Sequence, residues 1–558
     1  MPTVHLDSVT LTKGSEVSQA STFMNDQEYT SHGVSGSGQH AWHREDNLYR
    51  GGKYRCTRVY GPWIRASSAT NSVTQGDFAL GKAYFLAYYD YYHSRLVRQA
   101  SENSEYIILQ LVNTPWYMSE SNDTTPFAGN TPWIHANRRA PTDYDVLEDL
   151  CYDYCKRIQR DANCPDSRII FEILTESQHF WRNPLLDLLY FYQAAAKGAR
   201  RAVPESIICG VSPARWDHDI LYVETGSASP GVKINEQLVA NFAGSGLLDT
   251  LSWHSFTSIG REGYTNPGVY GADDWHDLAI AAADSWYDTA GVDPPAKYLL
   301  TEWTAGGTGT LPHLVYMLNH HLKVLEGQRF SIQTRAAWQD WSQEAAGDFT
   351  GWGLWHRANG GFAKPAMYLF TALDKGARLG FFWVDSTNNV AVFSNADRTE
   401  FVVLYSNTVA SNITINADAG MYITKTERMN GQGYLDEGYI GFTQQYDRDT
   451  VENDCIAVHI VKPDFAGGEW PFTSISDVGS QAQFVHSDTG RIPPLKAGDP
   501  VVVKGSASHE GKTGKVTGVS GSTVQTDIKF VSDDSGFLVK AGHKNSPLRA
   551  GRRIARRR

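Results

Sequence analysis

Strand-like and helix-like segments alternate along the chain from about residue 50 to about residue 375. The strand candidates are rich in β-branched and aromatic residues, and they span residues 54–60, 106–113, 168–176, 207–212, 250–256, 298–302 and 335–341. The helical candidates between them span residues 78–100, 143–162, 184–202, 274–289 and 311–325. This α/β rhythm predicts a parallel sheet flanked by helices, and its length fits a (β/α)8 TIM barrel at residues 41–375.

The pattern of the chain changes near residue 376. Short alternating strands separated by turn residues predict an antiparallel β-sandwich at residues 376–465. Residues 466–492 carry Gly, Pro and Ser and are predicted to be a linker, and a new strand pattern predicts a small β module at 493–547. Residues 548–558 form a basic tail. Residues 1–40 are polar, and we expect a first strand there, near residues 4–11.

Composition and charge restrict the functional classes. A content of 41% hydrophobic and 20% charged residues fits a folded chain of several domains. The 67 aromatic residues (16 Trp, 28 Tyr and 23 Phe) either stack on sugars or fill large cores, and composition leaves both open. The net charge is −11, yet the last 21 residues hold eight Lys and Arg and no acid. We expect this tail to bind an anionic partner, such as nucleic acid, an acidic glycan or an acidic protein surface.

The six cysteines have no zinc-site spacing, and we expect mostly buried free thiols. Neither a metal nor an organic cofactor is predicted. The first residues lack a charged region followed by an apolar run, so we expect no conventional signal peptide. No apolar run approaches 18 residues, so we expect no membrane span. The oligomeric state is open.

Two strand candidates end in a glutamate, namely Glu176 and Glu302. In a parallel barrel the C-terminal ends of the strands form the active face. Two carboxylates that converge there can hydrolyse a glycosidic bond. The alternative for each glutamate is a structural salt bridge at the end of a strand.

The residues around both glutamates resemble motifs of glycoside hydrolase clan A. Residues 171–177, Phe-Glu-Ile-Leu-Thr-Glu-Ser, resemble its fourth-strand motif, F-E-x-W-N-E, and residues 298–303, Tyr-Leu-Leu-Thr-Glu-Trp, resemble its seventh-strand motif. The resemblance implies that Glu176 is the acid/base, that Glu302 is the nucleophile, and that hydrolysis retains the anomeric configuration. Thr175 stands where the clan has an Asn that binds the substrate 2-hydroxyl, and this shorter side chain puts that contact in doubt.

Other positions fit the same resemblance. It implies that Arg58, on a second strand, lies beneath the nucleophile, and that His254, on a sixth strand, bonds it. It also implies substrate contacts for three tryptophans, namely Trp116, Trp303 and Trp338. An ordinary structural role is the alternative for each. Residues 351–368 resemble the stretch after the eighth strand in family-39 glycosidases, which leads into a β-sandwich.

A different class of function also fits the sequence. The chain could be a structural or glycan-binding protein of a virion, in a phage tail or on a capsid, that keeps a glycosidase-like barrel. The missing signal peptide, the basic tail and Thr175 motivate this reading, because virions leave the cell by lysis. Residues 498–503 and 511–516 resemble a KOW-type SH3-like barrel, which adds nucleic-acid binding as a third reading. The sugar and its linkage are open.

Overall fold

In the computed structural model the chain divides into two compact units. The barrel unit comprises Gly14–Arg378 with residues 430–433, and the β-rich unit comprises Met1–Lys13, Leu379–Met429 and Tyr434–Arg558. The structure describes residues 2–6, 9–13, 18–25, 54–60, 63, 66–67, 70–120, 139–175, 181, 183–213, 219–222, 227–257, 275–305, 313–327, 329–335, 365–407, 410–417, 422–430, 433–436, 441–442, 445–450, 454–461, 469–487, 495–504, 506–509, 512–533 and 535–540.

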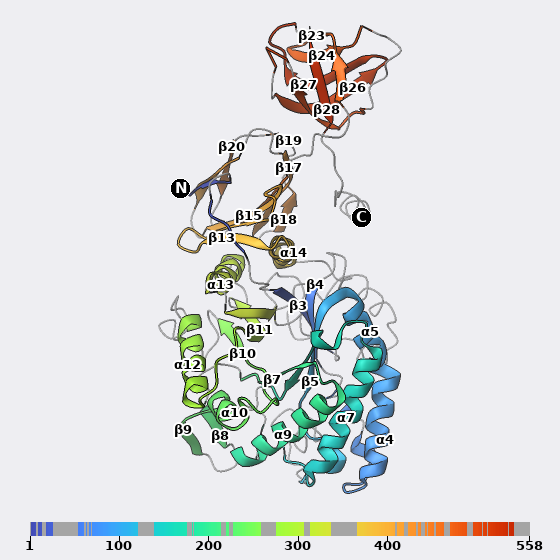
Figure 1. The fold of residues 1–558 in the computed structure, drawn as a ribbon, viewed down its shortest axis with the longest axis vertical. Coiled ribbons are helices and arrows are strands. Elements are labelled where there is room, and N and C mark those ends of the chain that lie inside the picture. The colour runs from blue at the N-terminus through green and yellow to red at the C-terminus, as the bar shows by residue number, and fades with distance from the viewer. Residues whose placement is uncertain are drawn as a thin grey trace. The chain divides into compact units, whose positions relative to one another are not determined.

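A curled parallel sheet forms the centre of the barrel unit (Figure 1). In chain order its strands are β3 (Ser18–Asn25), β4 (Tyr54–Tyr60), β5 (Ser104–Leu111), β6 (Ile169–Ile173), β7 (Ile207–Val211), β10 (Thr250–Thr257), β11 (Tyr298–Ala305) and β12 (Phe330–Arg335). Each strand pairs in parallel with its neighbour, and β12 pairs with β3, so the hydrogen bonding closes into a ring.

Helices follow these strands. They are α4 (Phe78–Tyr88), the π-helix η2 (Tyr89–His93) and α5 (Ser94–Asn103) after β4, α7 (Tyr144–Asp161) after β5, α9 (Leu185–Ala202) after β6, α10 (Ile234–Phe242) after β7, α12 (Trp275–Thr289) after β10, α13 (His313–Gly327) after β11 and α14 (Pro365–Ala377) after β12. The antiparallel pair β8 (Asp219–Tyr222) and β9 (Ser227–Lys233) precedes α10. Short 3-10 turns lie at η1 (Thr70–Ser72), η3 (Trp116–Met118) and η4 (Asp166–Arg168).

The α/β class is confirmed. A complete set of eight βα units stays a prediction, because residues 26–53 after β3 lie outside the described residues.

The sheet encloses a layer of apolar side chains. Successive side chains of a strand point to opposite faces, so every second residue points inward. The inward residues of this layer form one buried cluster of Cys56, Ile108, Ile170, Cys209, Leu299 and Ile332. The eighth strand, β12, is Phe330–Arg335 and buries Phe330 and Ile332, so it begins five residues before the strand candidate at 335–341. Residues 336–341 of that candidate lie outside the described residues.

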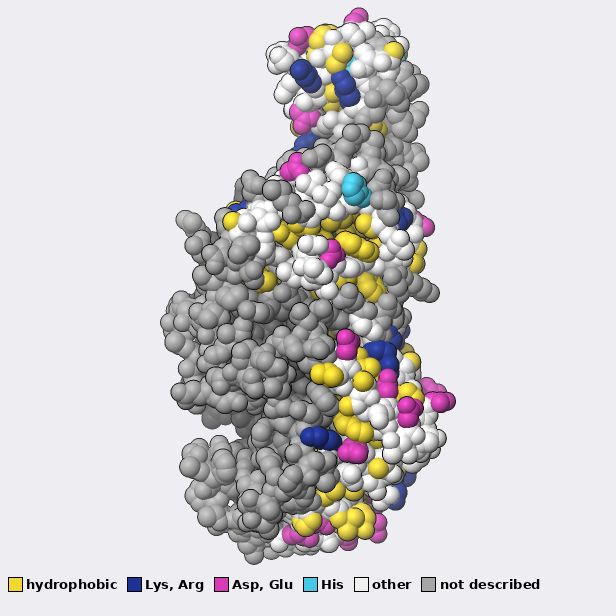
Figure 2. Space-filling view, turned by 90° about the vertical axis from the view of Figure 1, so that its left-hand side faces the viewer, with side chains coloured by type: hydrophobic (Ala, Val, Ile, Leu, Met, Phe, Trp, Pro, Cys, Tyr) yellow, Lys and Arg dark blue, Asp and Glu magenta, His cyan; other side chains and the backbone are white. Residues whose placement is uncertain are grey.

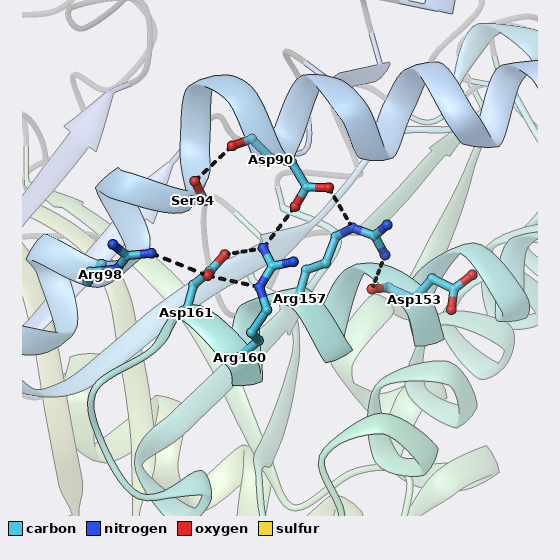
Figure 3. Close-up of polar contacts among 7 residues, drawn as sticks. All are labelled: Asp90, Ser94, Arg98, Asp153, Arg157, Arg160 and Asp161. Atoms are coloured by element: carbon cyan, nitrogen blue, oxygen red, sulfur yellow. Dashed lines mark hydrogen bonds and ion pairs between the residues drawn. The ribbon is translucent and has the colours of Figure 1, made fainter.

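Helix α7 joins the barrel wall through an apolar stripe and a polar network. Asp143 caps its N-terminus by accepting hydrogen bonds from the Asp145 and Val146 amides. Figure 3 shows Asp90 of η2 between Arg157 and Arg160 of α7. Asp90 Oδ2 lies 3.1 Å from Arg157 Nε, and Asp90 Oδ1 lies 2.8 Å from Arg160 Nη2. These ion pairs fix the η2 turn against α7, although their exposure keeps each of them weak.

The β-rich unit begins with two sheets around one core. The larger sheet has the order β18 (Gly433–Asp436), β17 (Tyr422–Asn430), β21 (Asp454–Val461), β15 (Glu400–Asn407), β14 (Val390–Ser394), β13 (Phe381–Asp385) and β2 (Thr12–Lys13), with β19 (Gly441–Phe442) paired to β17. The smaller sheet has the order β1 (Thr3–His5), β16 (Ser411–Asn416) and β20 (Gln445–Thr450). Val4, Ile415 and Val458 belong to the core that these sheets share.

The N-terminal segment therefore differs from the expectation. The first strand that we expected near residues 4–11 lies in the two sheets of the β-rich unit, because β1 pairs in parallel with β16 and β2 pairs antiparallel with β13. Arg398 holds this segment by donating to the carbonyls of Leu6 and Val9. The first strand of the barrel is β3, at Ser18–Asn25.

The remaining strands form a seven-stranded antiparallel sheet with its own core. Its order is β22 (Glu469–Phe472), β28 (Gly536–Lys540), β25 (Pro500–Lys504), β26 (Thr513–Ser520), β27 (Thr523–Lys529), β24 (Gln481–Val485) and β23 (Ser474–Val478). The predicted linker at 466–492 is wrong, because Trp470, Phe472 and Phe484 are buried in this core with Leu538. We call residues 469–540 the C-terminal module. Its SH3-like character stays a prediction, and the basic tail lies outside the described residues.

Two general features can be stated for the described residues. All six cysteines are free thiols and five are buried, as predicted. None of the described helices is long and apolar enough to cross a membrane. Figure 2 shows acidic, basic and hydrophobic side chains intermixed over the described part of one face.

Candidate active site

A layer of buried polar side chains lies at the C-terminal side of the apolar layer in the barrel. Four of its members come two residues after an inward apolar residue, since Arg58, Gln110, Glu172 and Thr301 follow Cys56, Ile108, Ile170 and Leu299. We define the polar layer as these four residues together with Ser212, Ser252 and His254. All seven are at most 2% exposed, so each buried polar group needs a partner inside the barrel.

Arg58 and Glu172 form the central ion pair of this layer. Arg58 Nε donates to Glu172 Oε2 at 2.8 Å, and Arg58 Nη2 lies 2.7 Å from the same oxygen. Gln110 Nε2 donates to that oxygen at 3.0 Å. Strands β4, β5 and β6 are therefore joined by one carboxylate that is fully buried.

The Glu172 carboxyl is held ionised by its surroundings. Burial alone raises its pKa, but the Arg58 charge and then the His254 charge lower it, and the hydroxyls of Ser212 and Thr301 act in the same direction. The net result is a pKa below the ordinary value. A fixed negative charge thus stands in the middle of the barrel.

Thr175 connects this ion pair to His254. Arg58 Nη2 donates to Thr175 Oγ1 at 3.3 Å, and the same hydroxyl oxygen lies 3.4 Å from His254 Nε2. His254 lies on β10, where its backbone amide donates to the Pro213 carbonyl at 2.8 Å. Three residues predicted from separate motifs therefore meet at the strand ends.

Hydroxyl groups continue the polar layer on the other side of Glu172. Thr301 Oγ1 of β11 donates to Ser212 Oγ at 2.8 Å, and Ser212 Oγ shares a 2.7 Å hydrogen bond with Ser252 Oγ of β10. These contacts join β11, the end of β7 and β10 just below the level of His254.

Backbone geometry marks the same strand ends. Leu174, directly before Thr175, has a φ of 61°, and Ser212 has a φ of 40°. Residues other than glycine seldom adopt such positive φ angles. The neighbouring packing must hold these residues there, which is common at functional sites.

The two candidate catalytic glutamates are placed to different extents. The backbone of Glu302 lies in β11, in register with His254 of β10, but its side chain is outside the described residues. Glu176 follows Thr175 directly and lies wholly outside the described residues. Counting from β3, β6 is the fourth strand and β11 the seventh, as the motifs predicted.

Of the three predicted tryptophans, one has a described side chain, namely Trp116. Trp116 lies in η3 after β5, where its indole N–H donates to the Val73 carbonyl at 3.1 Å. The Trp303 backbone pairs with Ser255 and Arg335, but its side chain is outside the described residues. Trp338 is outside them altogether. No described contact tests these three as substrate contacts.

The motifs alone did not identify Glu172, Gln110, Ser212, Ser252 or Thr301 as site residues. A signal was present, because Arg58, Gln110 and Glu172 are polar residues at inward positions of strands that are otherwise apolar. Among the described residues no group of three or more His, Cys, Asp or Glu side chains could hold a metal ion.

Comparison with known proteins places the fold. No protein-family model and no curated protein matches the chain. A solved glucosidase from Croceicoccus marinus matches with a TM-score of 0.57 at 12% identity, over 83% of this chain and 98% of the other. A family 51 α-L-arabinofuranosidase from Bifidobacterium longum matches with a TM-score of 0.53 at 9% identity, over 83% and 100%. BuGH86wt, solved with neoagarooctaose, matches with a TM-score of 0.52 at 9% identity, over 97% and 96%. At these identities the likeness shows a shared fold.

Proposed function

We propose that this protein is a retaining glycoside hydrolase with a complete (β/α)8 barrel, which cleaves an oligosaccharide or polysaccharide with two glutamates. The observation that carries the proposal is the convergence of Arg58, Thr175 and His254 beside the backbone of Glu302. The solved structures of similar fold, which include a glucosidase and an arabinofuranosidase, support it.

In this proposal Glu302 attacks the anomeric carbon, and the bond to the leaving oxygen breaks as Glu176 protonates that oxygen. A covalent glycosyl ester on Glu302 results. Glu176, now ionised, then takes a proton from water as the water attacks the anomeric carbon and the bond from that carbon to the Glu302 oxygen breaks. Two inversions at this carbon leave the anomeric configuration retained. This chemistry requires the two carboxyl groups to lie about 5–5.5 Å apart.

The test uses the full chain and a panel of aryl glycosides and polysaccharides. Release of reducing ends measures activity, and NMR of the first product identifies its anomer. We expect retention in the wild type and loss of nearly all turnover in Glu302→Gln, because an amide does not form the glycosyl ester. Glu176→Ala should impair substrates with poor leaving groups far more than activated aryl glycosides, and added azide should partly restore the deglycosylation step.

The matched control is Glu148→Gln on helix α7. Glu148 pairs with Arg201 at 2.8 Å on the outer surface of the barrel, so this variant should behave as the wild type. A wild type that is inactive on every glycoside would reject the proposed function. An inverted product would reject the double displacement while leaving hydrolysis intact.

A further inference from the structure

Glu172 is a carboxylate that the two-glutamate mechanism does not use. It is fully buried, and one of its oxygens accepts from both Arg58 and Gln110. Removing one partner of such a pair leaves a buried charge unpaired, whereas replacing both with apolar residues is often tolerated. If the ion pair served stability alone, apolar residues could replace both of its members. Its presence therefore points to a further role.

The geometry gives Arg58 two directions of contact. Its Nε and Nη2 face Glu172, and Nη2 also reaches Thr175 Oγ1, which lies 3.4 Å from His254 Nε2. The carboxylate thus fixes the plane of the guanidinium, and the guanidinium then fixes the hydroxyl that precedes Glu176 in the chain. Two nitrogens bound to one oxygen leave the guanidinium little freedom to turn.

We propose that Glu172 is a positioning residue, which orients Arg58 towards Thr175 and His254 and cancels the Arg58 charge. The kinetic part of this inference rests on the proposed function. The orientation of Arg58 does not, because a structure of a variant reports it directly.

Charge balance gives the proposal a signature in the pH dependence of activity. The described groups around Glu172, strand by strand, are Arg58 on β4, Gln110 on β5, Cys209 on β7 with Ser212 at its end, Ser252 and His254 on β10, and Thr301 on β11. Burial, and then the Glu172 charge, raise the pKa of the Cys209 thiol, so this thiol stays neutral. Among these groups, the Arg58 charge therefore acts most strongly on Glu172.

Glu172→Gln should move the whole pH–activity profile to lower pH. Losing a negative charge favours ionisation of both catalytic carboxyls, so both limbs of the profile shift in that direction. Arg58→Met should move it to higher pH, because a positive charge is lost. We expect shifts on the order of one pH unit, from a charge interaction screened by an effective dielectric of about 20.

The kinetic expectation is a loss in kcat of about 100-fold in Glu172→Gln with a smaller change in KM, as for other groups that preorganise a site. Glu172→Asp keeps the charge and should return the pH profile to its wild-type position. Glu148→Gln is again the control. Opposite shifts for Glu172→Gln and Arg58→Met, together with the return in Glu172→Asp, support the proposal. An unshifted profile in Glu172→Gln overturns it.

The structural arm uses a crystal structure of Glu172→Gln. We expect the Arg58 guanidinium to leave Thr175, so that Nη2 and Oγ1 separate beyond about 3.5 Å. An unmoved Arg58 overturns the positioning role even if the wild type has no glycosidase activity, in which case the proposed function fails separately.

If Glu172→Gln does not fold, the double variant Arg58→Met with Glu172→Leu replaces it in the kinetic arm. It removes both charges, so it should fold and keep the wild-type pH profile at a much reduced kcat. Wild-type activity in this double variant would show that the pair serves stability alone, and the proposal would then be rejected.

Discussion

Thr175 is the residue at which this chain departs from the clan A motif, and it also connects the polar layer. Its hydroxyl oxygen accepts from Arg58 and lies within reach of His254 Nε2. An asparagine there would present an amide to the substrate, whereas threonine presents one hydroxyl that protein groups already contact. The residue therefore belongs to the internal network as much as to the substrate surface.

Thr175→Val tests the hydroxyl at almost constant volume. We expect kcat/KM to fall about 10-fold, because a hydrogen bond of about 1–1.5 kcal/mol is lost. The melting temperature should change little, since Thr175 is only partly buried. Steady-state kinetics beside Thr289→Val, which removes an exposed hydroxyl of α12, would check this. Equal kinetics in both variants would contradict it.

Glu427 gives the β-rich unit a pH-dependent stability. Burial raises the pKa of Glu427. His459, whose Nε2 lies 2.6 Å from Glu427 Oε2, and the nearby Lys425 have a larger opposite effect, so the pKa falls to about 2 from the ordinary 4.5. Because the folded pKa is the lower one, its contribution is complete above pH 4.5 and is lost as the pH falls towards 2.

We expect Glu427→Gln to remove this slope. The wild type should lose up to about 3 kcal/mol of unfolding free energy between pH 5 and pH 2 from this one group. Urea unfolding at several pH values measures the loss. Asp397→Asn, at an exposed turn of the same unit, should keep the wild-type slope. A slope that survives in Glu427→Gln would assign the acid sensitivity elsewhere.

At the scale of elements, strand periodicity predicted most of the barrel correctly. Strand β4 has the predicted bounds. The predicted segment for α7 is one residue too long at each end, and that for α9 is one residue too long at its N-terminus. The failures have physical causes. Strand β3 is a Ser/Thr/Gln-containing strand whose parallel partners are far away in the chain, so no local pattern marks it. Strand β22 contains Pro471, which resembled linker composition although its aromatic neighbours enter a core.

The sequence likewise pointed to some residues of the candidate site and not to others. Motifs that end strands predicted Arg58, Thr175 and His254, because each stands next to a recognisable strand run. Glu172 lies within the fourth-strand motif, but only the three-dimensional register shows that Arg58 contacts it. The partners of a buried charge come from other strands, so they are not readable from the sequence around it.

Helices α7 and α9 approach closely at Gly198, and this contact yields a prediction at the same scale. A Cβ atom there would lie 2.4 Å from the Glu148 carbonyl oxygen and 2.7 Å from Cys151 Cβ. Gly198→Ala should therefore separate the two helices and destabilise the barrel by about 1–3 kcal/mol, despite the better helix propensity of alanine. Denaturant unfolding beside Lys197→Ala, an exposed neighbour on α9, would check this. A Gly198→Ala variant that is more stable than the wild type would show that α7 shifts away from α9 at little cost in free energy.

At the scale of the whole molecule, the C-terminal module has a separate core. Its buried residues run from Trp470 to Leu538 and all lie within residues 469–540. We propose it as a docking module for an anionic partner, with the basic tail as its charged end. Residues 1–464 should then fold and keep wild-type kinetics on a short oligosaccharide, because few contacts are expected to cross such a boundary.

Circular dichroism and kinetics of residues 1–464 would check the first part of this prediction. The matched control is truncation after Phe472, which cuts within the module and should expose apolar surface and aggregate. Heparin-agarose retention of the full chain, lost in residues 1–464 and weakened by salt, would check the docking part. Loss of activity in residues 1–464 would show that the module belongs to the active site or its core.

The pairing of the N-terminal segment has a consequence for the chain as it is being made. Strand β1 pairs with β16 through Thr3 and Thr414, and β3 pairs with β12 through Ser18 and Ile332. About 410 residues separate β1 from β16, and about 310 separate β3 from β12. At about 5–20 residues per second these partners are made roughly 20–80 s and 15–60 s after the strands that await them. Strand β1 therefore pairs only after most of the chain between it and β16 has been made. Val4 and Leu6 of this segment can enter the core of the β-rich unit only once its partner strands are present, so these apolar side chains must wait for them.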